Sequence, residues 1–247
     1  MKKKNPSRKR HWIIILSIVG FIVLAPFSSY AISYQPQTQA KRAYGNATQK
    51  NGYYEFLSTV SSVGIIFYPG GLVNPIAYAG FAESLSIASE SSVFVTQPLW
   101  NLAITHINAA STIIQENNNI DIWFIGGHSL GGSSAAFYAV DHLDQIDGVF
   151  FLASYTTSDA DFSQTSMPIL SITGSHDDIL DLETYQAAQV YLSPFTTSFI
   201  IEGGNHSQFG DYGFQRGDGI ADVTLNEQMN ETITTLTTWL MLINLVE

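Results

Sequence analysis

Short apolar runs alternate with longer amphipathic segments along most of the chain. Six runs have the length and composition of buried strands: 64–68, 92–96, 120–125, 148–152, 169–173 and 198–201. Several are apolar at every position, which is typical of parallel strands covered by helices on both faces. Residues 53–60 are a further candidate, for an edge strand.

The segments between these runs have helical length and spacing. They cover residues 78–90, 99–117, 132–143 and 182–191. A last helix is expected to begin at Thr224, where Thr-Leu-Asn-Glu forms a capping box, and to run toward Leu245. Strands and helices in this alternation predict an α/β fold, a doubly wound and mostly parallel sheet with helices on both faces. In such sheets the working residues follow the carboxyl ends of the strands.

The first 32 residues have the pattern of an export signal or a membrane anchor. Six of the ten Lys and Arg residues precede an apolar run at 12–27. The run is shorter than the ~20 residues of a full span, and Ser-Tyr-Ala at 29–31 resembles a cleavage site, which favours a cleaved signal. Continuation of the run through Ile32 and the basic flank favour an anchor instead. Either alternative places the folded part outside the cytoplasm, at the cell membrane or secreted.

Three regions are therefore expected. Residues 1–32 are the signal or anchor, residues 33–51 are a polar linker rich in Gln, Ala and Asn, and residues 52–247 are one folded domain. The chain of 247 residues is 45% hydrophobic, enough for one substantial core. It has no cysteine, which excludes disulfides, thiolate metal sites and a cysteine nucleophile.

The charge of the chain is divided unevenly. Beyond Ala31 there are 4 basic and 21 acidic residues, a net charge of 4 − 21 = −17. Such a surface repels phosphate backbones, so nucleic-acid binding is not expected. The same balance argues against tight docking of the folded body on anionic lipid headgroups.

One serine stands between glycines where an apolar run ends. Gly127-His-Ser-Leu-Gly131 fits the pattern G-x-S-x-G, in which a tight strand-to-helix turn exposes the hydroxyl of the central residue, here Ser129. Side chains at 127 and 131 would collide with the crowded backbone. The pattern alone also fits an ordinary glycine-rich turn, but the strand before it and the small-residue segment after it favour a nucleophile.

A nucleophilic serine needs a base, and the base needs an orienting carboxylate. In the strand–turn–helix arrangement these follow as Asp or Glu and then His, at the ends of later strands. Asp177 and Asp178 follow the run at 169–173, and His206 follows the run at 198–201. Taken singly, each also fits a solvated turn or a surface histidine, but their order and placement together predict a catalytic triad.

On these residues the chain resembles the α/β-hydrolase family over roughly residues 64–245. It is most similar to small bacterial dienelactone-hydrolase-like enzymes, in which the motifs Tyr-Pro-Gly-Gly (here 68–71), Gly-His-Ser-x-Gly and Gly-Gly-Asn-His-x-Gln-Phe-Gly (here 203–210) recur. The family pattern Gly-x-x-Asp at 174–177 implies that Asp177 is the acid, with Asp178 as the alternative.

The oxyanion of the reaction needs two N–H donors. The same template assigns one to Leu130, after the nucleophile, and one to the loop after the early strand, where Gly71 is the candidate. Many relatives have His-Gly where this chain has Pro69-Gly70, but a backbone donor does not depend on that side chain. A glycine turn without a catalytic part is the alternative.

The expected activity is hydrolysis of carboxylic esters through an acyl-enzyme, with no metal or organic cofactor. The connection 152–168 is too short for a helical lid, so the pocket is expected to be open, with an aromatic rim at 208–214, and to suit small or medium neutral esters. Two alternatives remain: acyl transfer to an alcohol on the same triad, and a non-catalytic surface binding protein that retained the fold.

Overall fold

The computed structural model describes residues 33–60 and 62–244. The predicted signal or anchor at 1–32 lies outside the described residues. Within them, no helix has both the length and the apolar character needed to cross a membrane.

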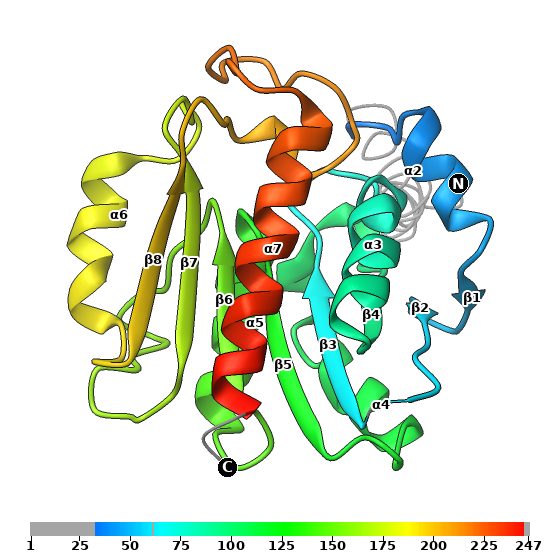
Figure 1. Ribbon diagram of the computed structural model, residues 1–247. Helices are drawn as coiled ribbons and strands as arrows, with labels where there is room; N and C mark the ends of the chain where they lie inside the picture. Colours follow the sequence, from blue (N-terminus) through cyan, green and yellow to red (C-terminus); the bar gives the residue numbers. More distant parts are fainter. Residues whose placement is uncertain (1–32, 61, 245–247) are drawn as a thin grey trace, which may run out of the picture.

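The centre of the fold is an eight-stranded sheet in the order β1-β2-β4-β3-β5-β6-β7-β8 (Figure 1). The pairs β1–β2 and β2–β4 are antiparallel, and the strands from β4 to β8 in this order are parallel. The strands are β1 (Thr48–Gln49), β2 (Tyr53–Phe56), β3 (Val63–Tyr68), β4 (Ser92–Thr96), β5 (Ile122–His128), β6 (Gly148–Leu152), β7 (Ile169–Gly174) and β8 (Thr196–Ile201). The predicted fold class is confirmed.

Helices cover both faces of the sheet. Side chains of α2 (Thr38–Tyr44), α3 (Ala79–Ser89) and α7 (Leu225–Asn244) pack on one face. The other face is covered by α4 (Ala109–Glu116) and α5 (Leu130–Asp141), with α6 (Leu182–Ala188) beside β7. Strand β3 shows why the run is continuously apolar: Ile65 and Phe67 enter the first core, Ile66 and Tyr68 the second, and all four are fully buried.

The predicted helix over 99–117 is wrong in its first half. That half consists of two 3₁₀ turns, Leu99–Asn101 and Ala103–His106, and α4 begins only at Ala109. Trp100 and Asn101 have φ values of 58° and 56°. A helix cannot continue through residues in this left-handed region, and helical spacing of apolar residues does not reveal it.

Residues 33–51, expected to be a polar linker, pack against the rest of the fold. Helix α2 buries Ala40 and Ala43, and Tyr44 meets the ring of Tyr54 edge-on at 5.1 Å. The backbone N–H of Ala40 also donates to Asp211 at 2.7 Å. Two alanines one turn apart give too small an apolar signal for the sequence to indicate this docking.

Candidate active site

Ser129 occupies a strained turn between β5 and α5. Its backbone has φ 52° and ψ −126°, a conformation that is unusual for a residue with a side chain. The turn is crowded, because a Cβ atom at Gly127 would lie 2.3 Å, and one at Gly131 2.1 Å, from the carbonyl oxygen of Tyr68. The glycines therefore allow strand and helix to meet closely, while the tight turn holds Ser129 at the carboxyl edge of the sheet.

Asp177 and His206 form a buried pair at the same edge. Nδ1 of His206 lies 2.9 Å from Oδ2 of Asp177, and the exposed fractions of the two side chains are 2% and 1%. The other carboxylate oxygen accepts the N–H groups of Ile179 at 3.0 Å and Leu180 at 2.8 Å. Because a carboxylate only accepts, Nδ1 is the protonated nitrogen, which leaves Nε2 free to take a proton.

The structure brings Ser129 and the Asp–His pair together. Ser129 and His206 line one cavity of about 270 Å³, together with Leu130, Tyr155 and Leu180. The hydroxyl of Ser129 has no hydrogen-bond partner among residues 33–60 and 62–244. A hydrogen bond between a serine hydroxyl and its histidine base is often long when no substrate is bound, and it shortens when substrate binds.

Asp178, the alternative acid, points elsewhere. It is exposed, and its backbone N–H lies 3.4 Å from an oxygen of Asp218. His206 pairs with Asp177 and not with its neighbour. Of the two candidate acids, Asp177 is therefore the one that contacts His206.

The two candidate oxyanion donors are neighbours. Within the described chain, the N–H groups of Gly71 and Leu130 have no acceptor, and a Cβ atom at Gly71 would lie 3.1 Å from the Leu130 side chain. The loop is held by a hydrogen bond from Leu72 N–H to the carbonyl of Asn101, at 2.7 Å. Leu130 lines the cavity beside Ser129, whereas Gly71 is not among its lining residues.

Sequence reasoning missed Asp218, which fixes the loop of His206. Its buried carboxylate accepts the backbone N–H groups of His206 at 3.3 Å and Ser207 at 2.7 Å, and also the Ser207 hydroxyl. In the sequence this residue stands in a Gly-Asp-Gly stretch that is indistinguishable from a solvated turn. No pattern along the chain identifies it.

A second missed group is Tyr78 with His128. The Tyr78 hydroxyl accepts the N–H of Gly70 at 3.0 Å and lies 2.8 Å from Nδ1 of His128, whose ring centroid is 4.4 Å from that of His206. Burial lowers the pKa of His128 well below its usual value, and the positive charge that His206 can carry lowers it further. Neutral His128 thus contacts the ring of His206 on one side and the Tyr78 hydroxyl on the other, and this hydroxyl binds the N–H of Gly70, next to Gly71.

No group of three or more His, Cys, Asp or Glu side chains that could hold a metal ion lies within the described part of the chain. The carboxyl edge of the sheet carries a strained serine after a central strand, and an Asp–His pair whose members follow two later strands. This combination is typical of the class of α/β proteins that place a serine at a tight strand-to-helix turn.

The model of the alpha/beta hydrolase family matches residues 64–230, and the chain belongs to this family. No curated protein matches it in sequence. Solved structures share the fold at low identity. The hyperthermophilic esterase from the archaeon Pyrobaculum calidifontis is 13% identical with a TM-score of 0.59, over 87% of this chain and 90% of that one.

Two further structures are similar. Dienelactone hydrolase from Anabaena variabilis is 11% identical with a TM-score of 0.55, over 76% of this chain and 90% of that one. A bacterial membrane phospholipase A is 12% identical with a TM-score of 0.57, over 97% of this chain and 99% of that one. These similarities establish the fold.

Proposed function

We propose that the chain is a serine hydrolase that cleaves carboxylic esters through an acyl-enzyme. Ser129 is the nucleophile, His206 the general base and acid, and Asp177 the group that orients the imidazole. The observation that carries the proposal is the 2.9 Å contact between Asp177 and His206 at the cavity lined by the strained Ser129.

The reaction follows from these positions. Nε2 of His206 takes the hydroxyl proton of Ser129 as Oγ attacks the ester carbonyl, and the N–H groups of Gly71 and Leu130 stabilise the oxyanion. The bond to the alkoxy oxygen then breaks, and His206 returns the proton to the departing alcohol. Water deprotonated by the same nitrogen attacks the acyl-serine, the ester bond to Oγ breaks, and His206 returns the proton to Oγ, which releases the acid and restores Ser129.

The cavity favours a neutral substrate. Ala153, Leu130, Ile179 and Leu180 give it apolar walls, and Asp181 is the one carboxylate among the described residues that line it. Residues 153–168 contain no helix that could cover it. A volume of about 270 Å³ suits a small or medium acyl group. The similar structures are those of an esterase, a dienelactone hydrolase and a phospholipase, whose names also refer to cleavage of ester bonds.

We also propose that residues 1–32 act as an export signal or membrane anchor. The support is the sequence itself, six cations followed by the apolar run 12–27. The catalytic domain then works outside the cytoplasm.

Labelling with a fluorophosphonate, combined with hydrolysis of p-nitrophenyl esters of increasing chain length, tests the proposal. The parent protein is expected to be labelled and active, and Ser129→Ala to be unlabelled, with kcat lower by on the order of 10⁴-fold or more. Ser166→Ala, which removes an exposed serine from the β6–β7 connection, is the matched control and is expected to behave as the parent.

The alternatives predict other results. A folded parent that is neither labelled nor active would contradict the proposal and favour a binding protein. Product analysis with an added alcohol separates hydrolysis from acyl transfer, because only transfer yields a new ester as the main product.

A further inference from the structure

The described chain enters the fold beside the catalytic loop. Tyr34 donates its N–H to the carbonyl of Leu72 at 2.8 Å and accepts the N–H of Asn74 at 3.0 Å. Ser33 is buried, and its hydroxyl accepts a hydrogen bond from the side chain of Asn101 at 2.9 Å. The first described residues are therefore fixed to the loop that begins at Gly71, at the carboxyl edge of the sheet.

The apolar run 12–27 is close to this entry point along the chain. From residue 27 to residue 33 there are six residue steps, which span at most about 22 Å when fully extended. If the run lies in a bilayer, as an anchor would, the carboxyl edge of the sheet is held next to that bilayer. The opposite edge lies farther away, since the 7-residue strand β5 alone is about 20 Å long.

The few cations of the folded body gather beside the same entry point. Lys41 and Arg42 belong to the last turn of α2, and Arg216 donates its backbone N–H to the Tyr34 hydroxyl at 3.3 Å. None of these three forms an ion pair within the part of the chain that the structure describes. Lys50, the remaining cation there, lies 3.5 Å from Glu55. The net charge of the whole body argues against tight docking on anionic headgroups, so any attraction to them has to come locally, from these three cations near the entry point.

The segments that carry these cations contact each other. Gln37, just before α2, donates its backbone N–H to the carbonyl of Asp211 at 2.8 Å. Figure 1 shows α2 and the loop before α7 at the upper end of the sheet, toward which the parallel strands point. The segments that carry the cations therefore lie at the end of the sheet where the described chain begins, and anionic headgroups at this end would attract the cations.

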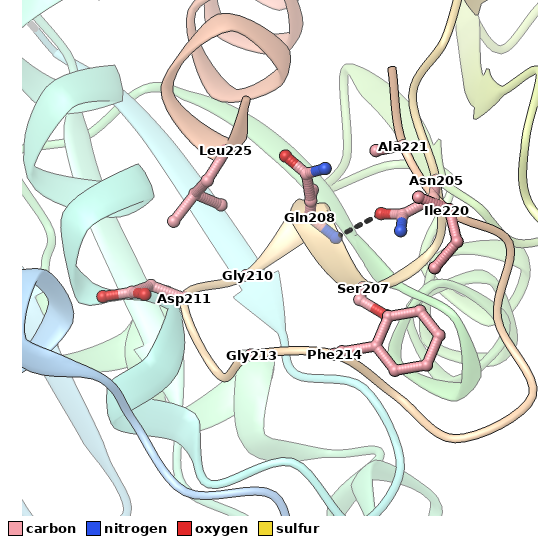
Figure 2. Close-up of a pocket in the computed structure, with 10 residues that line it drawn as sticks. All are labelled: Asn205, Ser207, Gln208, Gly210, Asp211, Gly213, Phe214, Ile220, Ala221 and Leu225. Atoms are coloured by element: carbon pink, nitrogen blue, oxygen red, sulfur yellow. Dashed lines mark hydrogen bonds between the residues drawn. The ribbon is translucent and has the colours of Figure 1, made fainter. Parts of the chain in front are cut away.

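The loop 211–223 also exposes large apolar side chains. Phe214 is 55% and Ile220 74% exposed, and Figure 2 shows them on neighbouring arms of the loop around a cavity of about 330 Å³ that extends to Ser207, next to His206. Exposed apolar side chains occur at the opposite edge too, for example Phe195. Exposed apolar side chains therefore do not identify which edge of the sheet docks on a bilayer. The entry point and the cations identify the carboxyl edge.

We propose that the carboxyl edge of the sheet docks on an anionic lipid bilayer, with the loop 211–223 and the end of α2 against the headgroups. Since the catalytic cavity opens at this edge, the substrates are esters carried by the bilayer rather than esters free in water. This substrate class rests on the proposed ester hydrolysis. The docking itself rests on the proposed membrane anchor, on the entry point and on the three cations.

The absence of cysteine allows a direct test with the full chain in vesicles of phosphatidylcholine and phosphatidylglycerol. Single fluorescent labels are attached at Phe214→Cys and, as the matched control, at Phe195→Cys, which is similarly exposed at the opposite edge. A quencher carried on the lipid chains is expected to quench the label at position 214 several-fold more strongly. Equal quenching at the two positions overturns the docking.

A second measurement tests the substrate class. The combined substitutions Lys41→Glu, Arg42→Glu and Arg216→Glu are expected to lower the ratio of vesicle-ester to soluble-ester hydrolysis at least about threefold, and added salt is expected to reduce this difference. Gln145→Glu, which adds a negative charge at an exposed position before β6 at the opposite edge, is the control and keeps the parent ratio. An unchanged ratio in the triple variant overturns the substrate class.

The outcomes separate the two proposals. Hydrolysis of soluble esters with equal quenching keeps the ester hydrolase and removes the docking. Strong quenching at position 214 without hydrolysis of either ester keeps the docking and removes the ester hydrolase.

Discussion

His128 gives the protein a specific dependence of stability on pH. The ring is fully buried, and its pKa is well below its usual value because burial and a charged His206 both disfavour the protonated form. In the unfolded chain the pKa returns to about 6.5. Below that pH the unfolded state binds a proton that the folded state does not. The stability that this difference contributes is therefore present well above pH 6.5 and is lost progressively as the pH falls through and below 6.5.

The size of the effect follows from the unfolded pKa. The free energy of protonating the unfolded side chain, RT ln(1 + 10^(6.5 − pH)), is about 0.1 kcal/mol at pH 7.5 and about 1.4 kcal/mol at pH 5.5. The folded protein should lose the difference, about 1.3 kcal/mol, through this one residue. His128→Asn removes the titration, while its side-chain oxygen can still accept from the Tyr78 hydroxyl, which lies 2.8 Å from Nδ1 in the parent.

Urea unfolding at pH 7.5 and 5.5 measures the effect. From pH 7.5 to pH 5.5 the free energy of unfolding of the parent should fall by about 1.3 kcal/mol more than that of His128→Asn. Any destabilisation by the substitution itself is the same at both pH values and cancels in this comparison. His106→Asn, a change at a partly exposed histidine, is the control and should keep the parent's loss. An equal loss in the parent and in His128→Asn would refute the reasoning, because it would mean that the buried ring is protonated as easily as a free one.

Three other changes test separate parts of the structure. Asp177→Asn should lower kcat/KM by on the order of 10⁴-fold in steady-state ester hydrolysis, because the imidazole loses its orienting carboxylate; a larger loss in Asp178→Asn would move the role to that residue. Thr224→Ala should cost about 1 kcal/mol of unfolding free energy in urea without changing kcat, since it removes the N-cap of α7; no loss would show that the cap is not needed. Gly131→Ala should destabilise the fold by about 2 kcal/mol or more in the same assay, because its Cβ would lie 2.1 Å from a carbonyl oxygen of β3; a parent-like midpoint would contradict the crowding.

The sequence predicts the parallel part of the sheet and the tight turn at Ser129 because both depend on local patterns. A strand buried on two faces is apolar at each position, as in β3. The turn at Ser129 needs glycines on both sides, and these stand within two residues of the serine. The capping box at Thr224 is equally local, and the structure has its hydrogen bonds.

The parts that the sequence does not predict depend on distant segments. The left-handed residues Trp100 and Asn101 are stabilised where the carbonyl of Asn101 accepts the N–H of Leu72, and no apolar pattern records such a bond. The docking of α2 depends on Asp211, which is 171 residues away from Ala40. A segment of polar composition can therefore be part of the folded body when another segment supplies its hydrogen-bond partners.

The residues that position the site share a property that explains why sequence reasoning misses them. Ser129, Asp177 and His206 could be proposed from the sequence because the proposed chemistry requires their side-chain types in a given order. Asp218 acts on the backbone N–H groups of His206 and Ser207, and Tyr78 on the N–H of Gly70. Every residue except proline carries a backbone N–H donor, so the residue type at the donor position does not indicate which side chain accepts from it. Candidate reacting groups can thus be proposed from residue identity, whereas the groups that hold them in place become visible only when the backbone is known.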